Sequence, residues 1–194
     1  MNHGCCQIRL YHRGYRMQTC RHFVVDSSGP CYYSYDGTDV GQALPGAVED
    51  TVMRGSTAMD IRRLALDTVY RATGTVIVID VLRAFTTAAF AFAAGAEAIT
   101  VVSEVQQAFD LRKEHPDWLL MGEEGGLPIE GFDFGNSPAA LRGEDLTGKH
   151  LVQRTSSGTQ GVVRSRNAEQ ILAASLCCAR ATADYVMALQ PSVV

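Results

Sequence analysis

The sequence predicts an α/β fold with three layers, α/β/α, around a largely parallel (mixed) sheet. Short runs of aliphatic and β-branched residues alternate with segments of helical periodicity from about residue 59 onward. The clearest run, Val76–Ile79, has no polar residue, as expected for a strand buried on both faces. Right-handed crossovers between such strands bring the loops that follow them to one edge of the sheet.

The expected strands follow the aliphatic runs in chain order. They cover residues 61–66 (a short edge strand), 76–81, 98–102, 118–121, 151–152 and 170–174. The expected helices lie between them, over residues 86–94, 103–114, a brief turn from 138, 159–164 and 177–189.

Local signals mark the ends of these helices. Gly95 is a natural C-terminal stop for the helix over 86–94. Ser103 and Gln106 have the spacing of a capping box at the start of the next helix. Ser137 and Pro138 suit the N-cap and first position of the brief helix.

Residues 1–58 differ in composition from residues 59–194, which we expect to form the α/β domain. The first segment holds four of the six cysteines, lacks helical periodicity and is punctuated by turn-forming dipeptides. We expect a poorly structured extension, either a mis-assigned start or a dispensable arm, since Met53 and Met59 offer internal starts. At the other end, residues 191–194 resemble the beginning of another strand, which predicts a domain truncated at its C-terminal part.

The composition predicts a cytoplasmic enzyme-sized domain. Hydrophobic residues make up 46% and charged residues 20%, with a net charge of -4. This balance argues against nucleic-acid or anionic-membrane partners, and we find neither a membrane-spanning run nor a signal peptide. The cysteines match no metal-ligand spacing, and Cys177 and Cys178 are expected to be small buried helix residues. Whether the chain forms a homo-oligomer is left open.

Asp80 is the strongest candidate for a catalytic residue. It ends the buried strand, where ligands of open α/β sheets bind, and an unpaired buried carboxylate is costly. Arg83 or a backbone amide would satisfy its charge without any function. The position of Asp80 at the switch from strand to helix favours a functional role, as a ligand of Mg²⁺ or as a nucleophile.

Three other candidates follow two predicted strands. Thr86 and Thr87 are expected helix caps that could equally contact a phosphate. Glu123 precedes two glycines after a strand and is expected to be a second metal-binding carboxylate. Glu124 is expected to face solvent.

Two further loops carry polar clusters. The loop near residue 130 offers two acids as general acid or base, and an amide and a hydroxyl for the substrate: Glu130, Asp133, Asn136 and Ser137. The turn after residue 152 suits an oxyanion and contains Arg154, Ser156, Ser157, Gly158 and Thr159. It is not a P-loop, because the required glycine and lysine spacing is absent.

These motifs together resemble the 2-phosphosulfolactate phosphatase family, from about Ile61 to the end of the chain. The matching strings are Val-Ile-Asp80-Val-Leu-Arg-Ala, Thr86-Thr87, Gly122-Glu, Gly125-Gly126-Leu, Ile-Glu130-Gly-Phe-Asp133-Phe-Gly-Asn-Ser-Pro138 and Thr155-Ser-Ser-Gly-Thr159. The family commonly has Thr-Thr-Asn-Gly-Thr at the last of these. The resemblance implies a Mg²⁺-dependent acid phosphatase that converts 2-phosphosulfolactate to 3-sulfolactate, as in coenzyme M biosynthesis.

The expected function is therefore metal-assisted hydrolysis of a phosphate monoester on a small anionic hydroxy acid. Asp80 and Glu123 would hold Mg²⁺, while Arg83, Thr86, Thr87 and the 156–159 turn would surround the phosphate. Two alternatives stay open: a phospho-ligand-binding module without turnover, and a phosphatase for another phosphorylated hydroxy acid.

Overall fold

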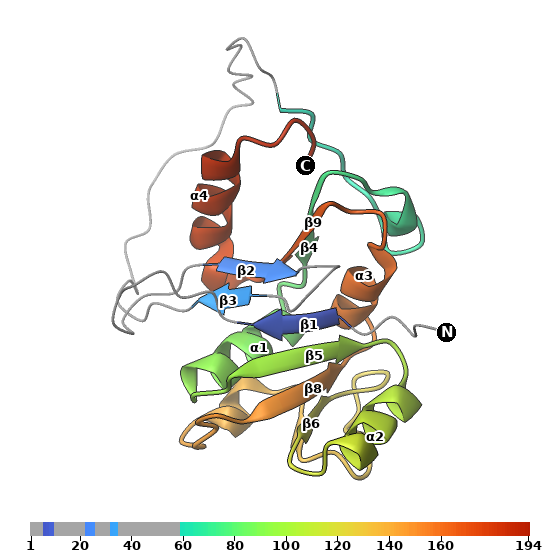
Figure 1. The fold of residues 1–194 in the computed structure, drawn as a ribbon, viewed down its shortest axis with the longest axis vertical. Helices are drawn as coiled ribbons and strands as arrows, with labels where there is room; N and C mark the ends of the chain where they lie inside the picture. The colour runs from blue at the N-terminus through green and yellow to red at the C-terminus, as the bar shows by residue number, and fades with distance from the viewer. Residues whose placement is uncertain (1–5, 10–21, 26–31, 35–58) are drawn as a thin grey trace.

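A computed structural model describes residues 6–9, 22–25, 32–34 and 59–194, with side chains described for 59–194 (Figure 1). Its strands form two sheets. The five-stranded sheet has the order β1 (Cys6–Arg9), β5 (Ala98–Val102), β8 (His150–Arg154), β6 (Leu119–Gly122), β7 (Phe134–Gly135). The four-stranded sheet has the order β3 (Tyr32–Ser34), β2 (His22–Val25), β9 (Gln170–Ala174), β4 (Thr75–Ile79).

Parallel pairing dominates the strands of the predicted domain. The neighbours β5–β8, β8–β6 and β6–β7 are parallel, and so is the pair β4–β9. The antiparallel pairs all involve β1, β2 or β3. The α/β class with a largely parallel, mixed arrangement is thus confirmed, although the strands divide between two sheets instead of forming one.

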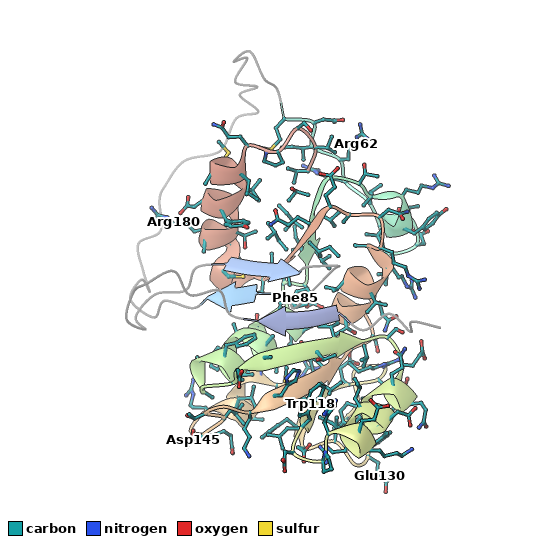
Figure 2. All side chains as sticks on the ribbon, viewed as in Figure 1. Arg62, Phe85, Trp118, Glu130, Asp145 and Arg180 are labelled. Carbon is teal, nitrogen blue, oxygen red and sulfur yellow. The ribbon has the colours of Figure 1, made fainter. Side chains whose placement is uncertain are left out.

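The helices cover both faces of the larger sheet because side chains alternate along each strand. Ile99 and Val101 of β5 pack into the main core with α1 (Ala84–Ala93), whereas Val102 packs with Leu120 and the α2 residue Ala108. Helix α2 spans Val105–Glu114. Phe85 of α1 is fully buried and lies near the middle of the molecule (Figure 2).

Two more helices and three 3₁₀ turns complete the fold. Helix α3 (Gly158–Arg164) contributes Val162 and Val163 to the main core, and α4 (Ala179–Leu189) follows β9. The turns are η1 (Val69–Arg71), η2 (Pro138–Leu141) and η3 (Leu176–Cys178). Cys178 is buried but Cys177 is exposed, so the prediction that both cysteines are buried is wrong for Cys177. Among the described residues, no helix is long and apolar enough to cross a membrane.

The structure corrects several local predictions. Residues 61–66 form no strand, and Ile61 and Leu64 are exposed, because only Asp60 makes a bridge, to Val193. Helix α1 begins two residues earlier than expected, at Ala84. The cap of α2 is shifted by one position: the Gln107 side chain accepts the N–H groups of Ser103 (3.1 Å) and Glu104 (3.0 Å).

Most of the expected extension over 1–58 lies outside the described residues; its described parts are the strands β1, β2 and β3. Residues 192–194 run beside residues 60–62, with the Arg62 N–H donating to the Val194 carbonyl (2.8 Å).

Candidate active site

Asp80 lies directly beyond β4, at the carboxyl edge that it shares with β9. Its N–H donates to the Ala174 carbonyl (2.9 Å), which extends the β4–β9 pairing by one residue. The next residues turn away into α1, so the Asp80 carboxylate stands where strand gives way to helix. The sequence predicted this placement.

Backbone groups from two elements surround the Asp80 carboxylate. The Ala84 N–H in the first turn of α1 donates to Oδ1 (3.3 Å), and the Gly158 N–H of α3 also donates to the carboxylate. A Cβ on Gly158 would lie 2.8 Å from Asp80 Oδ2 and 2.7 Å from the Ala84 Cβ. Glycine is therefore required here for close approach of the turn to the carboxylate.

The pKa of Asp80 is raised. Burial is the largest cause and outweighs the hydrogen bonds from Ala84 and Gly158, while the negative charge of Glu123 raises the pKa further. The positive charge of Arg83 acts in the opposite sense. Asp80 and Glu123 thus interact electrostatically, as expected if both belong to one site.

Glu123 is buried and ties two loops together. Its carboxylate accepts the Ser156 N–H (2.7 Å), the Gly126 N–H (2.6 Å) and the Ser156 hydroxyl (3.1 Å). Burial alone would raise its pKa, but these hydrogen bonds and the charge of Arg154 together lower it. Glu123 therefore stays ionised beside Asp80.

Arg154 is buried and supports the loops. Its guanidinium donates to the carbonyls of Ser103 (3.2 Å) and Glu123 (2.9 Å) and forms an ion pair with Glu124 (2.8 Å). All three nitrogens are thereby engaged. The geometry favours a positioning role over direct binding of a phosphate, and Glu124, although exposed, has this buried partner.

The turn 155–159 is held by its own hydroxyl groups. Thr159 is fully buried, and its hydroxyl accepts the Thr155 N–H (2.8 Å) and donates to the Thr155 carbonyl (2.9 Å). Ser157 is exposed at the N-cap of α3. Of the hydroxyl-bearing candidates in this turn, Ser157 alone presents an exposed side chain to a ligand.

The two threonines at the start of α1 also differ in exposure, one being buried and the other partly exposed. Thr87 is fully buried, and its hydroxyl donates to the Arg83 carbonyl (2.9 Å), which stabilises the first turn. Thr86 is partly exposed and makes a longer bond to the Val81 carbonyl (3.4 Å). Arg83 is exposed, and its guanidinium forms no hydrogen bond or ion pair with the other described residues.

Two buried amide oxygens in the described chain accept no hydrogen bond: Asn136 Oδ1 and Gln153 Oε1. Asn136 follows Gly135, which pairs with Gly122, so it lies one residue beyond the edge, as Glu123 does. Gln153 pairs in register with Met121 and donates from Nε2 to the Ala84 carbonyl (2.8 Å). Such orphaned acceptors are rare in native cores, and each calls for an explanation such as a catalytic role, backbone strain, or a bound water or ion.

Sequence reasoning missed Gln153. Its signal was a polar residue inside the run Leu151-Val152-Gln153, where a strand buried on both faces should be apolar.

The acids from the loop near residue 130 are not brought to Asp80. Glu130 is exposed and lies at the outer end of the molecule, near α2 (Figure 2). Asp133 forms an ion pair with Arg112 of α2 and accepts the Leu120 N–H (2.7 Å). Ser137 is the N-cap residue of η2 without a side-chain capping bond. Catalytic roles for Glu130 and Asp133 remain predictions without geometric support.

The residues at this edge fit Mg²⁺ in part. The described chain contains no group of three His, Cys, Asp or Glu side chains that could hold a metal. However, Mg²⁺ usually keeps several waters and takes only one or two protein carboxylates. Asp80, the neighbouring Glu123 and the unpartnered Asn136 oxygen supply the oxygen donors that this ion prefers.

A cavity of about 380 Å³ opens beside β4 and reaches this edge. Asp80, Ser157 and Gly158 line it together with Arg62 and Arg71. The remaining lining is largely aliphatic. A small molecule bound in this cavity would lie next to the Asp80 carboxylate.

The fold and the site define an α/β protein with an acidic, amide-lined site at the carboxyl ends of its strands. The 2-phosphosulpholactate phosphatase family matches residues 63–194. This covers more than half of the chain, so the chain belongs to that family.

Relatives agree with this assignment. Proteins described as "Probable 2-phosphosulfolactate phosphatase" are 42% identical over 113 residues in Bacillus subtilis and 44% identical over 119 residues in Carboxydothermus hydrogenoformans. A third, from Synechococcus sp. CC9605, is 44% identical over 123 residues. The matches cover 58%, 61% and 61% of this chain and 50%, 49% and 49% of the relatives. The chain thus spans about half the length of the relatives that it matches.

Proposed function

We propose that this chain carries the active site of a phosphatase for a small anionic hydroxy acid, with 2-phosphosulfolactate as the leading substrate. The observation that carries the proposal is the Asp80 carboxylate, held by N–H groups of α1 and α3 at a strand end and open to a cavity. The substrate is suggested by the names of the family and the relatives.

The residues fall into two groups by their contacts. Arg83, Thr86 and Ser157 are exposed or partly exposed near Asp80 and are the groups that we assign to the phosphate oxygens. Thr87, Arg154 and Thr159 are buried and hydrogen-bonded to backbone carbonyls, so we assign them to positioning the loops.

Asp80 is assigned the central chemical role. Its raised pKa reflects a carboxylate whose charge is disfavoured by burial and by Glu123, so a cation or a positively polarised phosphorus would relieve it. Whether it attacks phosphorus itself or orients a water is left to an aspartyl-phosphate trapping experiment. We propose Asp80 and Glu123, with Asn136, as the residues that hold Mg²⁺, which when bound would offset the negative charge of the transferring phosphoryl group.

The test is phosphate release from 2-phosphosulfolactate with and without Mg²⁺. We expect release that a chelator abolishes and that Asp80→Asn lowers by roughly 100-fold or more, about 2.7 kcal/mol of barrier. Asp110→Asn is the matched control, because Asp110 is exposed on α2 and its carboxylate contacts, among the described residues, the side chains of Lys113 and Gln106. Saturable binding of the substrate without release would instead indicate a binding module, and release from other phosphorylated hydroxy acids alone would change the substrate.

A further inference from the structure

The cavity that reaches Asp80 runs along the open side of β4. Among the described strands, β4 is the outermost of its sheet and pairs with β9 alone. Residues 76–79 of the strand line the cavity, as do residues 64–66. The cavity therefore follows the strand, and the four residue steps from Val76 to Asp80 correspond to about 13 Å.

Arg71 lines the same cavity near the amino end of β4, away from Asp80. It ends η1, and the carbonyl of the preceding residue, Tyr70, accepts the side-chain N–H of Asn167 (2.8 Å). Asn167 lies in the turn before β9, and the parallel strands β4 and β9 begin side by side. The cavity thus has a carboxylate at one end and a guanidinium at the other.

The charge of Arg71 is not neutralised by a carboxylate of the described chain. Its Nε donates to the Tyr70 hydroxyl (3.1 Å), and its guanidinium lies over the Tyr70 ring, 5.4 Å from the centroid. It forms no ion pair with the other described residues, whereas Arg62, which also lines the cavity, is paired with Asp60. Arg71 is therefore the arginine of the lining whose charge is left for a ligand.

Between its two ends the cavity has an aliphatic lining. Its volume of about 380 Å³ is within the range of pockets that hold small ligands. Large aliphatic side chains in the lining are open to solvent: Ile79 is 67% exposed, Leu64 44% and Leu66 36%. A methylene group that covers such side chains strengthens binding by up to about fourfold, whereas a charged group there would lose hydration without a partner.

We propose that this cavity binds the organic part of the substrate, and that its ligands are phosphorylated acids in which an aliphatic stem separates the phosphate from a carboxylate. The phosphate lies at Asp80, a placement that rests on the proposed function. The stem lies along β4 and the carboxylate pairs with Arg71. A three-carbon acid reaches only part of this length, so it would leave Arg71 and most of the aliphatic lining without a contact.

The primary test measures binding without turnover. Phosphonates have a carbon–phosphorus bond that phosphate-ester hydrolysis does not break, so 3-phosphonopropanoate and 6-phosphonohexanoate are titrated into the full chain with Mg²⁺ by calorimetry. The six-carbon compound should bind at least tenfold more tightly, because three further methylenes cover the aliphatic lining. Equal affinities would overturn the proposal. A dimer in light scattering that the six-carbon compound neither binds nor dissociates would also overturn it, because a second copy would then fill the cavity.

The role of Arg71 is tested with a ligand that lacks the carboxylate. Arg71→Gln should weaken binding of 6-phosphonohexanoate about fivefold and leave hexylphosphonate unchanged. Arg63→Gln is the matched control, because Arg63 is exposed and does not line the cavity. An equal loss for both ligands in Arg71→Gln would contradict the pairing of the carboxylate with Arg71.

Phosphate release separates this inference from the proposed function. Both hold if 6-(phosphonooxy)hexanoate releases phosphate with a lower KM than 2-phospholactate. Release from 2-phosphosulfolactate together with equal affinities for the two phosphonates would keep the phosphatase and overturn the stem site. Tighter binding of the six-carbon phosphonate without release from any phosphate ester would keep the stem site and overturn the proposed function.

Discussion

At the scale of single residues, the pKa values of the two carboxylates of the candidate site are shifted in opposite directions. The pKa of Asp80 is raised by burial and by Glu123, whereas the hydrogen bonds to Glu123 lower its own pKa. Pairs of titratable groups whose environments separate their pKa values are typical of sites that divide acid, base or ligand roles. Here Glu123 is the fixed charge, and Asp80 is the group whose charge a ligand would stabilise.

The lowered pKa of Glu123 predicts a specific dependence of stability on pH. A carboxylate with a lowered pKa in the folded state contributes stability above its unfolded pKa, about 4.3, and loses it as the pH falls through the folded value. Glu123→Gln should therefore lower the free energy of unfolding at pH 7 by about 1.5–3 kcal/mol, the usual range for hydrogen bonds to a charged group. Urea unfolding checks this.

The same comparison at pH 3.5 supplies the control, because the glutamate of the unfolded chain is then largely protonated, and the stabilisation that comes from the charged form in the folded state is being lost. The difference between the two proteins should shrink at that pH. A difference that is equal at pH 7 and pH 3.5 would contradict the assigned origin of the Glu123 pKa. The raised pKa of Asp80 makes its contribution to stability increase as the pH falls, opposite to that of Glu123. Because Asp80 is present in both proteins, comparing variant and wild type at each pH isolates the contribution of Glu123.

Site residues with a local sequence signal could be predicted, whereas those that depend on contacts distant in the chain could not. Asp80 could be found because its signal is local: a carboxylate that ends an aliphatic run. The contacts of Arg154 could not be predicted, because its partner carbonyl on Ser103 is 51 residues away in the chain. Glu130 and Asp133 were predicted from two acids that flank aromatic residues in one loop and from the family resemblance of that loop. Their spatial position depends on strand pairings that this local pattern does not encode.

At the scale of elements, the glycine that ends β6 controls the pairing of the central strands. Gly122 has φ +145°, and a Cβ there would lie 1.8 Å from the Arg154 carbonyl oxygen of β8. Gly135 is its register partner on β7, and a Cβ added to Gly135 would meet no atom within 4 Å. The two glycines are therefore a test position and its control: they are register partners, and only at Gly122 would a side chain meet a neighbouring strand.

We expect Gly122→Ala to separate β6 from β8, with a loss of several kcal/mol, at the upper end of single-substitution effects. Gly135→Ala should change the free energy of unfolding by less than about 1 kcal/mol. Thermal unfolding of both variants checks the prediction. Similar melting temperatures for the two variants would contradict the contact between Gly122 and Arg154.

Gln153 links two elements, β8 and the first turn of α1. Its Nε2 donates to the Ala84 carbonyl, and Ala84 in turn donates to Asp80. Gln153→Leu removes this bond and also the unpartnered buried oxygen, so stability should change by only about 1 kcal/mol. Phosphate release should nevertheless fall about tenfold, in kcat more than in KM, because Asp80 loses its support.

Gln170→Leu is the control for Gln153→Leu. Gln170 lies on β9 and donates to the Tyr185 hydroxyl of α4 (3.0 Å), at the strand end opposite to Asp80. It should leave kcat unchanged. Equal kcat values for Gln153→Leu and wild type would exclude a positioning role.

At the scale of the whole molecule, the sequence predicted which elements exist better than how they join. Strands such as β4 and β5 have a local signature, a run of β-branched residues, and both lie within one residue or two of their expected bounds. Strand order has no such signature, because β8 inserts between β5 and β6 through pairings distant in sequence. The division into two sheets followed from those pairings and was not predicted.

Ligand binding at the edge between these elements should stabilise the entire fold. Asp80 follows β4, Glu123 follows β6, and Gly158 begins α3, so a ligand that they share would connect elements of both sheets. A ligand that binds only the folded state stabilises it by about 2.7 kcal/mol at 100 times its Kd. Mg²⁺ with inorganic phosphate should therefore raise the melting temperature of the wild-type chain, and a chelator should reverse the shift. Asp80→Asn should melt at a temperature that these ligands do not change, whereas an equal shift in both proteins would place the binding site elsewhere in the molecule.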